Sequence, residues 1–332
     1  MDRIPPEIWC NIFSPICTDG GAMARSLSLV SREFYDASRS LRLQSVRCDG
    51  VDMIIRFASV LDRTPPPLQV VCHLFINSYY IKKPSPSLFQ SVTAMLSLRR
   101  KADETIECLR TEQGHASLLR ILTIIAPNLR TLALRIELIW LPLPFPPSLP
   151  ALVELSIQHT FFGRRLNHSV FHWIKSASSL RRLTLTGFLL ITDPIKVIES
   201  ITRFAPSLTH LGIPAEPANT TLMVYLLAAA IARSEIQSET VFPGTLESLV
   251  IEDSPMGDPP SRIIASGNRR IILAHRSNAR LADPGEMRLH WEARMNGRDG
   301  YWRTDENVEY SVGQLDAEYL DHQIRQTRLI DD

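Results

Sequence analysis

The chain has 332 residues, of which 45% are hydrophobic and 21% are charged; this length suits one large domain or a small module with a larger body, and this composition excludes a wholly disordered chain. A formal net charge of +1 argues against binding nucleic acid by bulk electrostatics, which needs a basic face. Five cysteines without a CxxC pair, and a start without the apolar stretch of a signal peptide, lead us to expect a cytoplasmic or nuclear protein with reduced thiols.

The first fifty residues predict three short helices. From Pro5 to about Phe13, apolar residues recur at three- and four-residue spacing, which is typical of an amphipathic helix. Residues 23–30 indicate a second helical segment. Ser31 is a plausible N-cap of a third helix that ends near Leu41. Three such helices are too few to bury a good core alone.

The next part of the chain alternates between turns, strands and helices. Thr64 to Pro67 reads "TPPP" and marks a turn or a stiff connector. Val70 to Ile76 is apolar and β-rich, so we expect a strand there. Ser87 to Leu98 places apolar residues on one helical face, and a helical interpretation with breaks can extend to about Ile125. The longest apolar run, residues 222–232, is too short to cross a bilayer as a helix, so no membrane contact is expected.

One short phrase, L-x-x-L-x-[LI], recurs five times. Its copies are separated by 23, 28, 28 and 38 residues, and they begin at Leu129, Leu152, Leu180, Leu208 and Leu246. These intervals are close to those of leucine-rich repeats, except for the last. The alternating tail of each phrase predicts a strand with leucines inward and polar residues outward. The asparagine or cysteine that usually follows is missing, so the repeats are degenerate.

Helical patterns lie between these phrases. Pro194 to Ala205 is the clearest, and residues 170–177 and 221–232 can play the same part. Ile271 to Leu273 is a candidate for one more strand. Strands that alternate with helices must pair in parallel. The fold class is therefore predicted to be α/β, with a short three-helix module followed by an irregular leucine-rich-repeat solenoid that has parallel strands on one side and helices on the other.

The N-terminal residues resemble the F-box. Its usual form is L-P-x-E-[IL], then an I-F pair, then V-S-R/K followed by an aromatic, and this chain carries Ile4-Pro5-Pro6-Glu7-Ile8, Ile12-Phe13, Val30-Ser31-Arg32 and Phe34. The likeness covers residues 3 to 45, and the leucine-rich body adds to it, as in F-box-like proteins of fungi. Three features depart from the pattern: Ile4 in place of leucine, Phe34 in place of tryptophan, and a "TDGG" insertion.

The resemblance implies a substrate-recognition subunit of a ubiquitin ligase. Residues 1–48 would dock on a Skp-type adaptor and through it on a cullin; residues 49–275 would form the repeat domain that holds an unknown protein target; residues 276–332 would be a capping segment and acidic tail. The adaptor-binding residues would be Pro5, Pro6, Ile8, Ile12, Phe13, Leu27 and Val30. Outward positions of the repeated strands would form a row that reads the target: Arg130, Glu154, Arg182, His210 and Ser248.

Other readings of the sequence stay open. The repeat body could be a protein-binding scaffold without any ubiquitin link, its N-terminal helices serving as a cap. His168 and His172 have the i,i+4 spacing of a metal pair, but no third ligand is near them. Asp253 and Asp258 are better explained as turn residues than as paired carboxylates. Because no nucleophile, base and orienting group cluster by spacing, we expect no enzyme, cofactor or metal.

Overall fold

The structure is a computed structural model, and it describes residues 4–78, 112–137, 145–146, 148–160, 176–186, 194–215, 245–253, 271–274 and 284–298. The chain divides into two compact units. The first comprises Met1–Ile125 and Leu134–Pro146, and the second comprises Ala126–Ala133 and Pro147–Asp332. Within these described ranges, none of the helices has the length and apolarity needed to cross a membrane.

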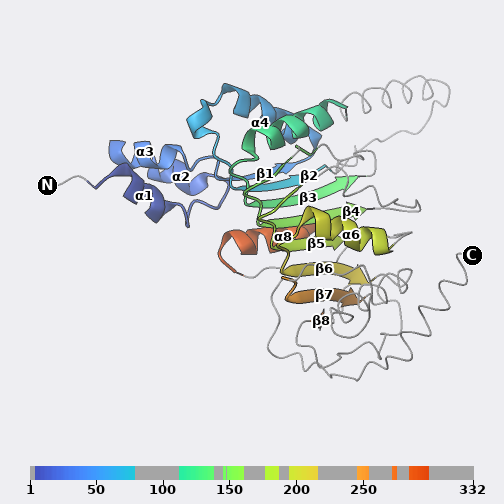
Figure 1. Cartoon of the computed structure of the whole chain (residues 1–332). Coiled ribbons are helices and arrows are strands. Elements are labelled where there is room, and N and C mark those ends of the chain that lie inside the picture. Colours follow the sequence, from blue (N-terminus) through green and yellow to red (C-terminus); the bar gives the residue numbers. More distant parts are fainter. Residues whose placement is uncertain are drawn as a thin grey trace, which may run out of the picture. The chain divides into compact units, whose positions relative to one another are not determined.

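Three short helices open the first unit, as the sequence predicts (Figure 1). They are α1 (Pro6–Phe13), α2 (Ala22–Leu27) and α3 (Arg32–Arg39). The expected N-cap is in place, because the Ser31 hydroxyl accepts a hydrogen bond of 3.2 Å from the backbone N–H of Phe34. A serine side chain satisfies one of the helix N–H groups that lack an internal partner, so it fixes where α3 begins.

The first unit continues with a β-α-β segment. Strand β1 (Ser45–Asp49) leads through α4 (Val51–Arg63) and the short 3-10 helix η1 (Pro66–Leu68) to β2 (His73–Asn77), and the two strands pair in parallel. A further helix covers residues 112–125 and precedes β3 (Thr131–Glu137). The expected strand at Val70 begins three residues later. The predicted helix from Ser87 to Leu98 lies outside the described residues, whereas the expected helical extension to about Ile125 agrees with the helix at 112–125.

The second unit is built on parallel strands that follow one another in chain order. They are β4 (Glu154–Thr160), β5 (Arg182–Thr186), β6 (His210–Ala215), β7 (Ser248–Asp253) and β8 (Ile271–Ala274), with α6 (Pro194–Phe204) before β6 and α8 (Pro284–Met295) after β8. Each recurring leucine phrase lies on a strand from β3 to β7. The α/β class and the parallel pairing are therefore confirmed, whereas a leucine-rich-repeat solenoid stays a prediction.

Two predicted helices of this unit fall wholly or mostly outside the described residues. Residues 221–232 lie outside the described part of the chain. Of residues 170–177 only the last two are described, and Ser176 forms an isolated parallel bridge with Ser148 instead of a helical turn.

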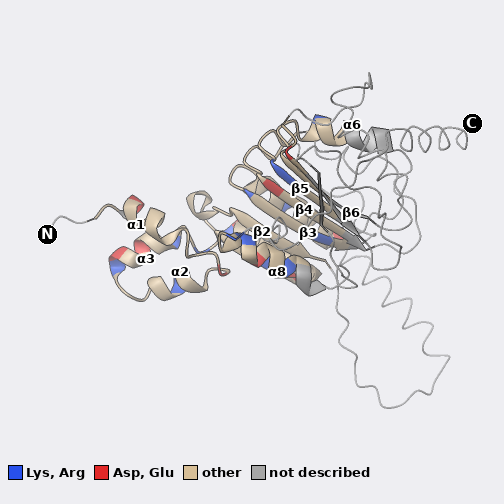
Figure 2. Cartoon of the chain, turned by 90° about the horizontal axis from the view of Figure 1, so that it is seen from below, with Lys and Arg blue, Asp and Glu red and all other residues tan. Residues whose placement is uncertain are grey.

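The strands of the second unit have two different faces. Leu155 and Ile157 of β4 and Leu183 and Leu185 of β5 are buried, and side chains two residues apart point to the same side of a strand. The intervening positions are polar and face the other way. Figure 2 shows α6 and α8 on opposite sides of these strands. The sequence had predicted no helix at α8, only a capping segment.

The "TDGG" insertion ends at a glycine that the packing requires, and this generates a first prediction. Gly20 and Gly21 both have positive φ, of 73° and 82°, but a Cβ atom on Gly21 would collide with the backbone carbonyl of Arg42, while one on Gly20 would meet nothing. We expect Gly20→Ala to cost about 1 kcal/mol of left-handed strain and Gly21→Ala roughly 2–4 kcal/mol, because a clash adds to that strain. Urea unfolding of both variants measures the difference, and equal midpoints would contradict it.

Candidate functional site on the N-terminal helices

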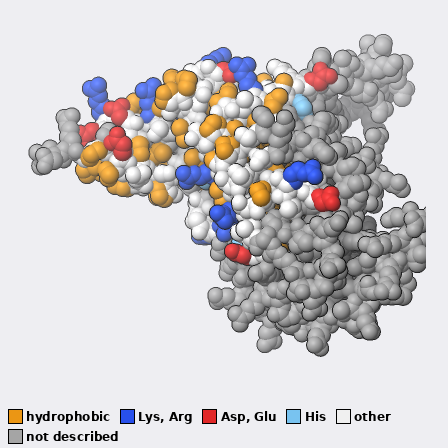
Figure 3. Space-filling model, in the orientation of Figure 1, with side chains coloured by type: hydrophobic (Ala, Val, Ile, Leu, Met, Phe, Trp, Pro, Cys, Tyr) orange, Lys and Arg blue, Asp and Glu red, His pale blue; other side chains and the backbone are white. Residues whose placement is uncertain are grey.

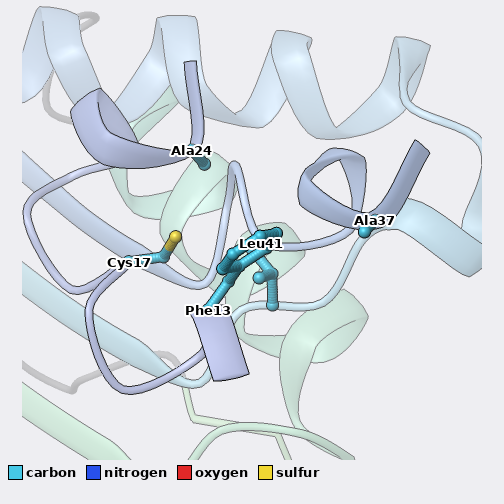
Figure 4. Packing of buried hydrophobic residues seen from close by; sticks show 5 residues of the cluster. All are labelled: Phe13, Cys17, Ala24, Ala37 and Leu41. Carbon is cyan, nitrogen blue, oxygen red and sulfur yellow. The ribbon is translucent and has the colours of Figure 1, made fainter. Parts of the chain in front are cut away.

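The three N-terminal helices have a core of their own. Its buried members, shown in Figure 4, are Phe13, Cys17, Ala24, Ala37 and Leu41. Two partly buried aromatic residues enclose Phe13. The ring centroids of Phe13 and Trp9 are 5.4 Å apart, and those of Phe13 and Phe34 are 5.0 Å apart with the rings nearly perpendicular. Such aromatic pairs add to the stabilisation from burial, so they hold α1 against α3.

Polar contacts fix the same helices at their ends. The carboxylate of Asp19 accepts the backbone N–H of Met23 at 2.8 Å, which places the insertion at the start of α2. The Cys10 thiol donates to the carbonyl of Ala37 at 3.1 Å, which ties α1 to α3. An acidic group at a helix N-terminus satisfies a free N–H and interacts favourably with the helix dipole. The insertion that departs from the F-box pattern thus has a structural role of its own.

The outer side of α1 is apolar and open. Ile8 and Ile12 of α1, with Ile4 just before the helix and Ile16 just after it, recur every four residues and are all about half exposed; we call these four residues the α1 stripe. Leu29 and Val30 precede α3, and Leu29 is 88% exposed. Figure 3 shows hydrophobic side chains gathered on the surface of these helices, at the left of the view. Exposed aliphatic residues concentrated on one small module make this face a candidate contact surface.

The residues that the F-box resemblance selects fall into three groups. Pro5, Ile8, Ile12 and Val30 are exposed, and Leu27 is half-buried. Phe13 is buried in the core, so its side chain is not available to a partner and instead sets the position of α1. Pro6 lies at the first position of α1, but the structure does not describe its side chain.

A single side chain links these helices to the strands of the first unit. The amide of buried Gln44 donates to the backbone carbonyl of Ser14 at 3.0 Å, and its oxygen accepts the Ser14 hydroxyl at 3.2 Å. The backbone carbonyl of Gln44 also accepts the N–H groups of Cys72 and His73 at 2.9 and 3.0 Å. Gln44 therefore joins the end of α1 to the start of β2.

The expected target-binding row forms across four strands of the second unit. The register aligns Glu154 with Arg182, Arg182 with His210, and His210 with Ser248; we call these four residues the polar row. Arg130 precedes β3 and is exposed, and its backbone carbonyl accepts the N–H groups of Val153 and Glu154.

The polar row is not open in this structure. Glu154 and Ser248 are buried, and Arg182 and His210 are partly buried. Helix α8 contributes to this cover, because Arg294 donates from Nε to Oε2 of Glu154 at 2.9 Å. Arg182 approaches the same oxygen at 3.7 Å. Sequence reasoning missed Arg294, since 140 residues separate it from its partner and no local pattern connects them.

His210 has an unusual electrostatic setting. Burial lowers its pKa first, the positive charges of Arg182 and Arg294 lower it further, and Glu247 opposes them. The Thr209 hydroxyl donates its one proton to the carbonyl of Arg181 at 2.9 Å. In its contact of 2.8 Å with Nδ1 of His210 it must therefore accept, so Nδ1 carries a proton. The folded chain therefore favours the neutral imidazole with its proton on Nδ1.

Two observations on the described residues concern metal ligation and thiol chemistry. These residues contain no group of three or more His, Cys, Asp or Glu side chains that could hold a metal ion. Burial, and then the charge of Asp49, raise the pKa of the Cys48 thiol to about 12, so it is a poor nucleophile at neutral pH. Asp253 ends β7, and the remaining sequence candidates, His168, His172 and Asp258, lie outside the described residues.

Comparison with known proteins adds no family to this description. A scan against protein-family models and a search of curated proteins both found no match to this chain. What the fold and the candidate site define is an α/β chain with parallel strands and an apolar helical module.

A second prediction separates the inner and outer sides of α1. Phe13 is 5% exposed and Ile12 is 51% exposed, although they are neighbours in one helix. Phe13→Ala should cost roughly 3–5 kcal/mol because it leaves a cavity among aromatic rings, whereas Ile12→Ala should cost less than about 1 kcal/mol. Hydrogen exchange of the amides in α1 and α3 measures both local unfolding free energies. Similar exchange in the two variants would contradict this assignment.

A third prediction concerns acid stability. A histidine whose pKa is lower when folded than when unfolded contributes stability above its unfolded value of 6.5, and that stability is lost as the pH falls below it. The urea midpoint of the wild type should therefore fall more between pH 7.5 and 5.5 than that of His210→Gln, which keeps a polar side chain but does not titrate. The same fall in both proteins would show that His210 is not responsible.

Proposed function

We propose that this chain is a substrate-recognition subunit of a Skp–cullin–F-box type ubiquitin ligase. In this proposal α1 to α3 are an F-box-like module that docks on a Skp-type adaptor, and through it on a cullin. The strands with the recurring leucine phrase are a degenerate leucine-rich-repeat body that binds a protein target. The chain itself carries out no chemical step.

One observation carries the adaptor half of this proposal. The helical module already has a buried core around Phe13, yet it also exposes the α1 stripe together with Leu29 and Val30. Burying an aliphatic side chain contributes about 1.5–3 kcal/mol relative to leaving it exposed. A partner helix laid along α1 would recover that free energy, as when an amphipathic helix packs into an apolar groove.

The target half of the proposal is supported by the strand arrangement. Each leucine phrase from β4 to β7 occupies one strand, and each strand pairs in parallel with the next phrase. Such a series places equivalent side chains in rows, and repeat proteins use rows of this kind to contact an extended partner surface.

The test is co-purification with a Skp-type adaptor. Ile8→Asp and Ile12→Asp each place a charge on the exposed α1 stripe, and a substitution at the centre of an interface typically costs 2 kcal/mol or more, which is about a 30-fold loss of affinity. Val60→Asp on α4 is the matched control, because Val60 is 48% exposed and Ile8 is 47% exposed. Phe13→Asp is unsuitable, since it would disrupt the core.

The outcome separates this function from the alternative. If the wild type and Val60→Asp capture the adaptor while the Ile8 and Ile12 variants do not, the module docks as proposed. If the wild type captures none, or all four proteins capture it equally, the docking proposal fails.

A scaffold without a ubiquitin link is favoured by one observation, the bonds of Gln44 to Ser14, Cys72 and His73. These bonds make α1 continuous with the strands of the first unit, as expected of a cap. Deleting residues 1–48 would not distinguish the two functions, because the deletion would remove most of β1 as well. The point variants on the α1 stripe leave β1 intact.

A further inference from the structure

The buried carboxylate of Glu154 affects which chain segments can pack against the polar row. The side chain of Glu154 is 7% exposed and is held between Arg294 at 2.9 Å and Arg182 at 3.7 Å. A charge removed from water is tolerated only with a close counter-charge, and removal of one partner is strongly destabilising. Arg182 belongs to the row itself and is the more distant of the two partners, so a chain segment that covers the row gains by bringing a second, closer cation to Glu154, as α8 does with Arg294.

The surface around Glu154 is both apolar and polar. Trp291 and Met295 of α8 are buried, and they lie three residues before and one residue after Arg294 in the helix. On β5 the hydroxyl of Thr184 is buried, and it has no hydrogen-bond partner in the part of the chain that the structure describes. Thr184 lies two residues after Arg182, so both side chains point to the same face. The Thr184 hydroxyl can therefore form a hydrogen bond with a polar group that α8 does not supply.

Two arginines of α8, Arg288 and Arg294, have different partners. Arg294 reaches the strands, whereas Arg288 pairs with Glu292 one turn along the same helix, at 3.0 Å. Leu289 points to solvent and is 59% exposed. One turn of α8 is thus fitted to the polar row, and the preceding turn is typical of a surface helix.

From these contacts we infer that the polar row is a binding site for a helix of the target protein that presents an arginine beside a large apolar side chain, and that α8 occupies this site until such a helix displaces it. The inference rests on the proposed function, since it names the segment that the repeat body would recognise. A target arginine would replace Arg294 at Glu154, and a polar group beside it could reach the Thr184 hydroxyl. After the exchange, the Glu154 carboxylate is again paired with an arginine. A target must therefore bind the polar row more tightly than α8 does.

The experiment uses the full chain and a synthetic peptide. The probe is a fluorescein-labelled peptide with the sequence of residues 284–298, which contains the arginine and the apolar residues of α8. Three proteins are compared: the wild type, Arg294→Ala, and the matched control Arg288→Ala. Loss of Arg294 weakens the hold of α8 on the row and leaves Glu154 available to the peptide. Loss of Arg288 removes an equal charge from the same helix without touching the strands.

We expect Arg294→Ala to bind the peptide at least tenfold more tightly than the wild type and Arg288→Ala, measured by fluorescence anisotropy. Amides of residues 287–295 should exchange faster in Arg294→Ala alone, with the protection of β4 and β5 unchanged. A second substitution, Glu154→Gln, should remove the gain in peptide affinity. Arg294→Lys, which keeps the charge, should resemble the wild type.

Two results would overturn the inference. Equal peptide affinity in the wild type and Arg294→Ala would show that α8 does not compete for the row. Loss of protection throughout β4 and β5 in Arg294→Ala would show that α8 is a fixed part of the core. Neither readout involves the adaptor, so failure of the ligase proposal appears as lost co-purification with peptide binding intact, and the two failures are distinguishable.

Discussion

The packing of Phe13 between Trp9 and Phe34 determines what the N-terminal module can do. This contact fixes the rotation of α1 about its own axis, with one side facing α3 and the other side left open. A helix repeats every 3.6 residues, so residues four apart stay on one side. With Trp9 and Phe13 inside, Ile8 and Ile12 of the same helix must lie outside. The exposed stripe is thus a direct consequence of the aromatic core.

In the strands of the second unit, too, the burial of one side determines which residues lie on the other side, but here the residues on that other side are polar. Leu155, Leu183 and Leu211 are buried on one side of these strands. The alternating backbone then places Glu154, Arg182, His210 and Ser248 together on the other side. An apolar helix is a poor cover for a row of this composition, because Arg182, at 3.7 Å, would be left as the counter-charge of the buried Glu154 without a closer partner. Arg294 resolves this conflict, and it also helps to keep the neighbouring His210 neutral.

The parts of the fold that could be predicted from sequence are those encoded by local periodicity. The leucine phrase predicts β3 to β7 and their parallel order, and Ser31 predicts the start of α3. Helix α4 was missed although its signal is present: Ile54, Phe57, Ala58 and Leu61 are buried at helical spacing. Strand β1 was missed because "SVRCD" is short and polar, and its pairing with β2 determines its conformation.

The site was only partly predictable, for a physical reason. The register of the row follows from the repeats, but the burial of Glu154 depends on a helix 140 residues away. Helix α8 has a weak pattern, because Trp291 and Met295 are its only buried residues within 287–298, where the structure describes side chains. Likewise, the F-box resemblance predicts Phe13 as an adaptor-binding residue because of its residue type. Only the packing shows that Phe13 is buried and that it holds α1 in position.

The two surfaces differ in what they can contribute to binding. Aliphatic side chains on α1 can add affinity through buried area, but they discriminate poorly between apolar partners, because the hydrophobic effect has no direction. The polar row can discriminate between segments by charge, since a segment that lacks a cation opposite Glu154 leaves that buried carboxylate with Arg182 at 3.7 Å and without a closer partner. Under the proposed function, docking on an invariant adaptor would use the first property and the choice of a target would use the second. The apolar stripe lies along α1 and the buried carboxylate lies on β4, so the two properties belong to separate elements.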